Sequence, residues 1–235
     1  MMACVLNELP RYELYADFSA MFTQDTETYD TGSLEMFARL DQWLRTLAHD
    51  LSIITAAIGG SNPQSLIYEQ FMRTRVMTNV VLHRLLKKYP VIEEADKFHE
   101  ICRVAMLTHL CCTLNSWLEF RKIRDPLNIK ILRRLLIEVS GNWIKEGLRD
   151  LKLWMLFVGV ADAVEDGDKA WFTNELRKLI PPGSYLSRWE DIEDILKGFW
   201  WAGNNSAMRY QTAHGHVFAE EEELSVPIRE RTITP

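Results

Sequence analysis

The sequence predicts an all-α protein, a single-domain, irregular helical bundle of about seven to nine helices. Helix-forming residues dominate, and Gly and Pro fall mostly between segments in which apolar residues recur at helical spacing. No Asn-Gly or Asp-Gly turn joins two segments of alternating apolar and polar residues, as a β-hairpin would require. Hydrophobic residues make up 47% of the 235 positions, which is enough to form a packed core.

The composition changes twice along the chain and indicates three parts. Residues 1–32 are a mixed N-terminal segment that is expected to be partly helical. Residues 33–216 carry the apolar periodicity and form the helical domain. Residues 217–235 include four consecutive glutamates and are expected to be an acidic, disordered tail.

The first three helices of the domain are defined by apolar spacing. The first is predicted to start at Ser33 as its N-cap and to end at Ile58, because apolar residues from Phe37 onward alternate at spacings of three and four. The next two are expected over about 63–88 and 92–120. The third is apolar on more than one face, so we expect it to be central and buried.

The later helices are separated by prolines, glycines and acidic residues. Gly167 is a natural stop after the acidic cluster that begins at Asp162, and Ser187 is expected to cap the helix that follows it, with Glu190 as its capping-box partner. These helices are predicted at about 128–139, from 142 to the acidic cluster, and at 169–180, 188–200 and 203–214.

The overall charge and the cysteines limit the classes of function. A formal net charge of −6 argues against direct binding of nucleic acid through phosphate contacts. The cysteines form no C-x-x-C pair, so we expect no cysteine zinc site, no disulfide framework and a reducing intracellular compartment. They are Cys4, Cys102, Cys111 and Cys112. Neither a secretory signal nor an apolar run of about 20 residues is present, so no membrane association is expected.

The acidic cluster is the first candidate for a chemical site. It holds Asp162, Glu165, Asp166 and Asp168. On a continuous helix the first three would share a face and could hold magnesium, as enzymes that use diphosphates require. Because a helix C-terminus disfavours anions, we instead interpret the cluster as a solvated, structural turn between two helices.

The other polar candidates are also given structural interpretations. The segment 204–206 (Asn-Asn-Ser) is expected to cap a helix, since Arg209 stands where a second metal-binding motif would need an acid. His214 and His216 would share a face only on a strand, so a flexible segment is expected there. His109 is interpreted as a hydrogen-bonded core residue.

A basic segment precedes the acidic cluster. It contains Arg121, Lys122, Arg124, Lys130, Arg133 and Arg134. Such a segment can contact an acidic partner or a phosphate, but the preferred interpretation is a solvated helix face. The eight tryptophans are interpreted in the same structural way, as members of a core rich in large side chains.

Residues 151–201 have the order of a known family. An apolar run, LKLWMLFVGVADA, is followed by an acidic gap, by KAWFTNELRKLI, by a Pro/Gly break and by SRWEDIEDILKGFWW. This order resembles the C-terminal part of the regulatory region of fungal-specific transcription factors, where it usually accompanies a zinc cluster of six cysteines. The matching positions, here called the signature residues, are Trp154, Phe157, Ala161, Trp171, Phe172, Leu176, Trp189, Ile192, Leu196 and Trp200.

The resemblance implies a regulatory module that controls transcription by RNA polymerase II in the nucleus. It implies action through a small-molecule effector or through protein contacts, with no cofactor, no metal and no catalytic residues. The six-cysteine cluster of that family is absent from this sequence, so the chain is not expected to bind DNA directly.

Two other classes of function remain open. A relative recruited to secondary metabolism could cyclise or isomerise an apolar metabolite in an aromatic-lined pocket, with Asp162, Glu165 and Asp166 as first metal candidates. A dimerisation module could pair two copies through the apolar face from Phe37 to Ile58, although burial of that face in the chain's own core is the preferred interpretation.

Overall fold

The computed structural model confirms the all-α prediction. It describes residues 42–59, 68–86, 94–117, 126–139, 148–181, 184, 186 and 188–224, which form eight helices and no strand. The helices are α3 (Gln42–Gly59), α4 (Tyr68–Leu86), α5 (Glu94–Trp117), α6 (Pro126–Glu138), α7 (Arg149–Asp162), α8 (Asp166–Leu179), α9 (Trp189–Lys197) and α10 (Gly203–Leu224). None of these helices is both long enough and apolar enough to cross a bilayer.

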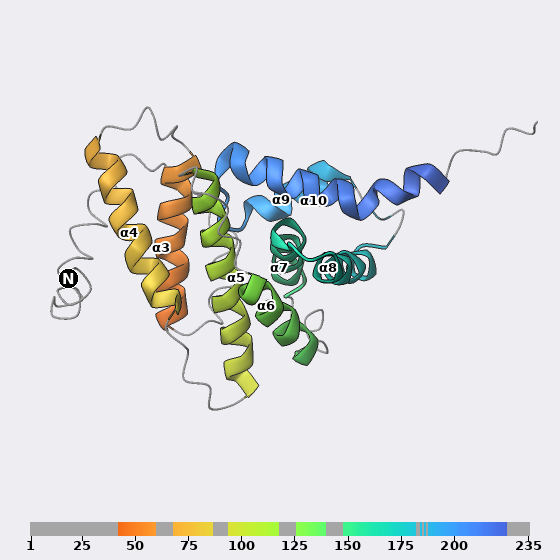
Figure 1. The fold of residues 1–235 in the computed structure, drawn as a ribbon, viewed down its shortest axis with the longest axis horizontal. Helices are drawn as coiled ribbons and strands as arrows, with labels where there is room; N and C mark the ends of the chain where they lie inside the picture. Colours follow the sequence, from red (N-terminus) through yellow and green to blue (C-terminus); the bar gives the residue numbers. More distant parts are fainter. Residues whose placement is uncertain are drawn as a thin grey trace, which may run out of the picture.

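The helices pack as two groups joined by α5 and α10. Helices α3, α4 and α5 lie side by side, and α7 pairs with α8 beside them (Figure 1). Helix α5 also contacts α6 and α7, while α10 runs across the top of the view and contacts α3, α5, α7, α8 and α9. One continuous apolar core therefore extends from α3 to α10.

The apolar face of α3 is buried inside the chain. Leu44, Leu47, Leu51, Ile54 and Ile58 are each at most 1% exposed. A second copy of the chain cannot use these side chains for pairing, so the hypothesis of a dimer through this face is wrong for the described part of the helix. The same spacing that suggested a dimer seam instead anchors α3 to α4, α5 and α10.

Two close approaches of the backbone depend on glycine. Gly159 of α7 lies directly against the ring of Phe172 of α8, and both residues are buried. Gly59, at the end of α3, meets Gly203, whose φ of +54° lies in the left-handed region. A Cβ on Gly59 would stand 2.7 Å from the nitrogen of Gly203, so the absent side chains let α3 and α10 meet end to end.

Several predicted boundaries are wrong. Helix α7 ends at Asp162, and α8 begins at Asp166, so Gly167 lies inside α8 and does not end the preceding helix. The start of α8 at Asp166 is favourable, because Asp166 and Asp168 then lie in its first turn, where acidic residues interact favourably with the helix dipole. Pro126 begins α6, where proline suits the first turn. Helix α10 continues to Leu224, so the segment expected to be a disordered tail is helical at its start.

Other expectations fall outside the described residues. These are the partly helical segment 1–32, the N-cap at Ser33, the helix ends at 63–67 and 142–147 and the segment 225–235. The prediction for α9 is wrong at both ends, because Arg188 is its N-cap in place of Ser187 and the helix ends at Lys197 in place of residue 200. The central position predicted for the third helix is confirmed, because α5 is buried on all sides from Glu100 to Leu110.

Candidate functional site

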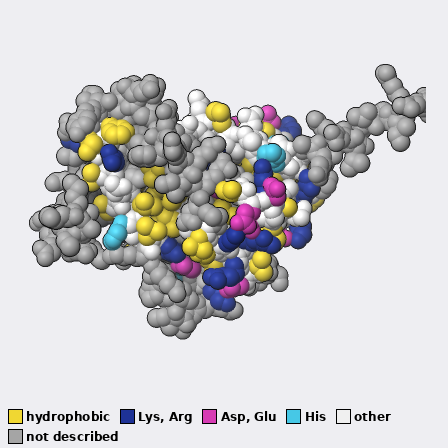
Figure 2. Space-filling model, in the orientation of Figure 1, with side chains coloured by type: hydrophobic (Ala, Val, Ile, Leu, Met, Phe, Trp, Pro, Cys, Tyr) yellow, Lys and Arg dark blue, Asp and Glu magenta, His cyan; other side chains and the backbone are white. Residues whose placement is uncertain are grey.

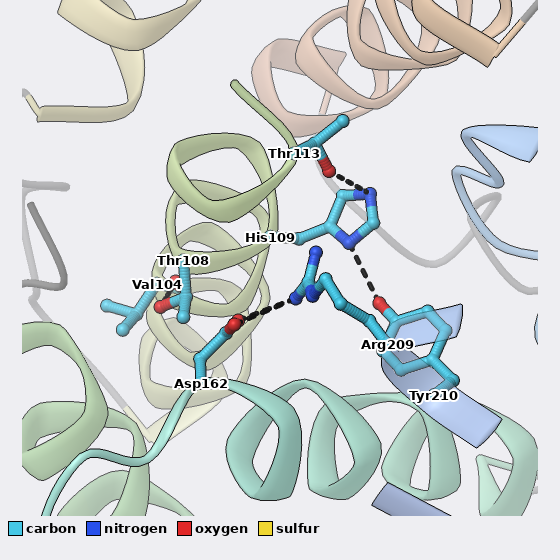
Figure 3. Close-up of polar contacts among 7 residues, drawn as sticks. All are labelled: Val104, Thr108, His109, Thr113, Asp162, Arg209 and Tyr210. Atoms are coloured by element: carbon cyan, nitrogen blue, oxygen red, sulfur yellow. Dashed lines mark hydrogen bonds and ion pairs between the residues drawn. The ribbon is translucent and has the colours of Figure 1, made fainter. Parts of the chain in front are cut away.

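Helices α5, α7 and α10 meet at a buried polar network. His109 and Thr113 come from α5, Asp162 ends α7, and Arg209 and Tyr210 are consecutive residues of α10 (Figure 3). His109 is 0% exposed and Tyr210 is 1% exposed, although both carry polar atoms. Polar groups are costly to bury without partners, so their mutual contacts hold the three helices in one register.

The charged half of the network is the ion pair of Asp162 and Arg209. One guanidinium nitrogen, Nη2, lies 2.9 Å from Oδ1 and 2.8 Å from Oδ2 of the carboxylate. Both side chains are largely buried, with 6% of Asp162 and 16% of Arg209 exposed. Burial opposes the charge of Arg209, but the carboxylate of Asp162 outweighs it and raises the pKa of Arg209 further. Arg209 therefore stays positively charged opposite the carboxylate of Asp162.

The neutral half of the network is centred on His109. Its Nδ1 lies 2.9 Å from the hydroxyl oxygen of Tyr210, and its Nε2 lies 3.4 Å from Oγ1 of Thr113. A neutral imidazole has one donor and one acceptor nitrogen, and hydroxyl groups can match either tautomer. Burial, together with the positive charge of Arg209, lowers the pKa of His109 to about 3. Burial likewise raises the pKa of Tyr210, so both groups stay neutral.

The neutral state of His109 predicts a loss of stability in acid. The folded pKa of about 3 lies below the ordinary histidine pKa of 6.5, so the unfolded chain binds this proton more readily. The contribution of neutral His109 to the free energy of unfolding is complete above pH 6.5 and is lost as the pH falls toward 3. Between pH 7.5 and pH 5 we expect the free energy of unfolding to fall by about 2 kcal/mol more in the native protein than in His109→Gln.

Urea titrations at the two pH values measure this difference. His216 is an exposed residue of α10 and supplies the control, because His216→Gln should retain the pH dependence of the native protein. A carbon-bound imidazole proton of His109 that titrates above pH 5.5 in an NMR experiment would contradict the prediction.

The acidic cluster is paired with the basic segment. Glu165 lies 2.6 Å from Nζ of Lys130, and Asp168 lies 2.8 Å from Nη1 of Arg133. Figure 2 shows basic and acidic side chains interleaved on the face over α6. The prediction of a solvated turn is wrong for Asp162 and Asp168, which are each 5% exposed, and holds only for the exposed Glu165 and Asp166.

The carboxylates of the cluster face different cations. Asp162 turns inward to Arg209, whereas Glu165 and Asp168 turn toward α6. Within the described ranges, no three residues of the types His, Cys, Asp and Glu come together as a metal site would need. Asp162 is therefore paired with a guanidinium and has no neighbouring set of ligands for magnesium among the described residues.

The remaining polar candidates all lie on α10. Helix α10 begins at Gly203, so the segment 204–206 lies inside its first turns and is not the predicted cap that precedes it. Ser206 is buried and accepts a hydrogen bond of 2.9 Å from the backbone N–H of Ala202. His214 and His216 also lie on α10, so the prediction of a flexible segment at these residues is wrong. The ring of His214 packs against Phe218, with centroids 4.6 Å apart.

The signature residues lie in one packed region. Trp154 of α7 contacts Trp200, with ring centroids 4.8 Å apart, and the indole N–H of Trp200 donates a 2.8 Å hydrogen bond to the backbone oxygen of Ala48 in α3. Seven of the ten are core members: Trp154, Phe157, Phe172, Leu176, Ile192, Leu196 and Trp200. Ala161, Trp171 and Trp189 are partly buried against the same core.

Fold and site together define an all-α protein in which acidic and basic side chains of different helices form ion pairs with one another. Comparisons with family models, with curated proteins and with solved structures found no match.

Sequence reasoning missed the partners of the charged residues. In the sequence Arg209 only stands in place of an acid, whereas in the structure it pairs with Asp162. The opposite charges of the basic segment in α6 and of the α7–α8 turn are the signal in the sequence that the two segments bind each other.

Proposed function

We propose that this chain is a regulatory module of the kind that its resemblance to the fungal-specific transcription factor domain implies. It would act in the nucleus on transcription by RNA polymerase II, through an effector or protein contacts and without binding DNA directly. The observation that carries the proposal is the use of the signature residues. They come from α7, α8, α9 and the segment that follows α9, and all ten belong to the core or pack against it.

The arrangement of the charged residues supports a module without catalysis. A catalytic carboxylate must be able to reach a substrate or a metal, and Asp162 is instead engaged by Arg209 and 5% exposed. His109 is completely buried and keeps a low pKa, so it does not resemble a general base that is tuned near neutral pH.

A reporter experiment tests the proposal. The full chain is fused to an unrelated sequence-specific DNA-binding domain and expressed with a promoter that carries sites for that domain. We expect transcription to differ from the level set by the DNA-binding domain alone. The effect should disappear with Gly159→Ala, which disrupts the packing of α7 on α8, and should persist with Gly167→Ala, where an added Cβ meets no atom within 4 Å.

Two results would overturn the proposal. One is a fusion that accumulates normally, is folded, and leaves transcription at the control level. The other is magnesium-dependent turnover of a prenyl diphosphate by the purified chain that is lost in Glu165→Ala, an exposed position whose replacement leaves the core intact. The second result would favour the enzyme alternative.

A further inference from the structure

Helix α10 buries few apolar side chains. Among its side chains that the structure describes, only Ser206, Tyr210, Ala213 and Val217 are buried, and they form one narrow stripe. In α7, by contrast, ten of fourteen residues are buried. Because apolar burial is the main source of stability, α10 is held more weakly by packing than the helices beneath it.

Polar contacts supply the attachment that packing does not. The ion pair of Arg209 with Asp162 and the hydrogen bond of Tyr210 with His109 tie the middle of α10 to α7 and α5. Further along, Nε of Arg177 donates a 2.9 Å hydrogen bond to the backbone oxygen of Val217. We call the two contacts made by Arg209 and Tyr210 the polar latch.

The geometry of the polar latch favours two states over a graded motion. Buried charges are stable only in good register, because a small displacement breaks their contacts before water can reach them. Once α10 has moved away, Arg209, Asp162, Tyr210 and His109 can all be hydrated. Contacts of this kind therefore specify a single closed position of α10 and permit a second state in which α10 is displaced and these groups are hydrated.

The two ends of α10 have different attachments. At the N-terminal end, Gly59 and Gly203 meet through their backbones, and a residue at positive φ such as Gly203 is suited to act as a pivot. Toward the other end, a Cβ on Gly215 would meet no atom within 4 Å. Glycine inside a helix lowers its stability relative to alanine, so Gly215 favours opening without serving the packing.

We propose that α10 is a displaceable helix, which moves as one unit away from α5 and α7 while the other helices stay folded. The polar latch holds α10 in the closed position. Opening uncovers Phe157, whose ring contacts that of Tyr210 at a centroid distance of 6.3 Å. It also uncovers His109 and Asp162. This device does not depend on the proposed transcriptional role.

Hydrogen exchange of the full chain, followed by NMR or mass spectrometry, tests the proposal. In the native protein we expect the amides of residues 207–217 to be protected and yet to exchange at least about tenfold faster than the slowest amides of residues 152–160. Arg209→Gln should speed exchange in α10 by about tenfold or more, because the latch is lost. Gly215→Ala should slow it about fourfold.

A control variant distinguishes opening of α10 from global unfolding. Phe172→Leu weakens the contact of α7 with α8, which persists when α10 opens, so it should speed the slowest α7 amides and leave those of α10 within about twofold. Equal protection of α10 and α7 in the native protein, with both accelerated alike by Phe172→Leu, would overturn the proposal. Absence of protection in α10 would overturn it too, since nothing would then hold the helix closed.

Discussion

Replacing Asp162 with alanine should lower the free energy of unfolding by about 3 kcal/mol or more. The change leaves the guanidinium of Arg209 largely buried, with 16% of its side chain exposed, and removes the carboxylate that both contacts require. An uncompensated buried charge costs more than the intact pair contributes. Urea unfolding at pH 7.5 measures the effect.

Glu165→Ala is a matched control for this prediction. Glu165 lies three residues further on and also forms an ion pair, but 54% of its side chain and 50% of that of Lys130 are exposed. Exposed pairs contribute at most about 1 kcal/mol, so this variant should be close to the native protein. If Asp162→Ala and Glu165→Ala cost the same, the pair with Arg209 does not have the energetic role assigned to it.

A double variant separates the loss of a charge from the loss of packing. Asp162→Leu combined with Arg209→Met replaces the pair by apolar side chains, and it should recover most of the stability lost in Asp162→Ala. It should not restore the closed register of α10, because apolar contacts are less directional than the ion pair. A double variant as unstable as Asp162→Ala would show that the cavity at this position, and not the unpaired charge, is the main cost.

Gly159→Ala is the second change with a large expected effect. An added Cβ would stand 2.6 Å from Cγ of Phe172 and closer still to Cδ1 and Cε1. An aromatic ring is rigid, and Phe172 is 0% exposed, so relief requires α7 and α8 to separate. We expect a loss of about 3 kcal/mol in the free energy of unfolding, at the upper end of the usual cost of overpacking.

Two further variants test the cause of that loss. Gly167→Ala adds the same methyl group where no atom lies within 4 Å, and it should change stability by less than about 1 kcal/mol. Combining Gly159→Ala with Phe172→Leu removes the ring that the methyl group meets. The double variant should therefore be less destabilised than the sum of its two single changes, and simple additivity would rule out the clash.

The apolar faces of the helices could be predicted because they are written in local spacing. The alternation of three and four between Leu44 and Ile58 is sufficient to predict a one-faced helix, and all five apolar residues of that face in α3 are buried. Helix ends were less certain, because a turn such as that at Asp162 to Asp166 depends on what the acids contact. The same limit applies to α10, whose continuation past His214 no local signal indicated.

The sequence by itself determined the fold class and the apolar faces of the helices, because helical periodicity is a property of neighbouring residues. Only the tertiary structure decided which charges neutralise one another. Arg209 and Asp162 are 47 positions apart, and Lys130 and Glu165 are 35 apart, so their contacts exist only after the helices have packed. That packing gives the buried carboxylates Asp162 and Asp168 their cations, since a buried carboxylate requires one and Arg209 and Arg133 come from other helices.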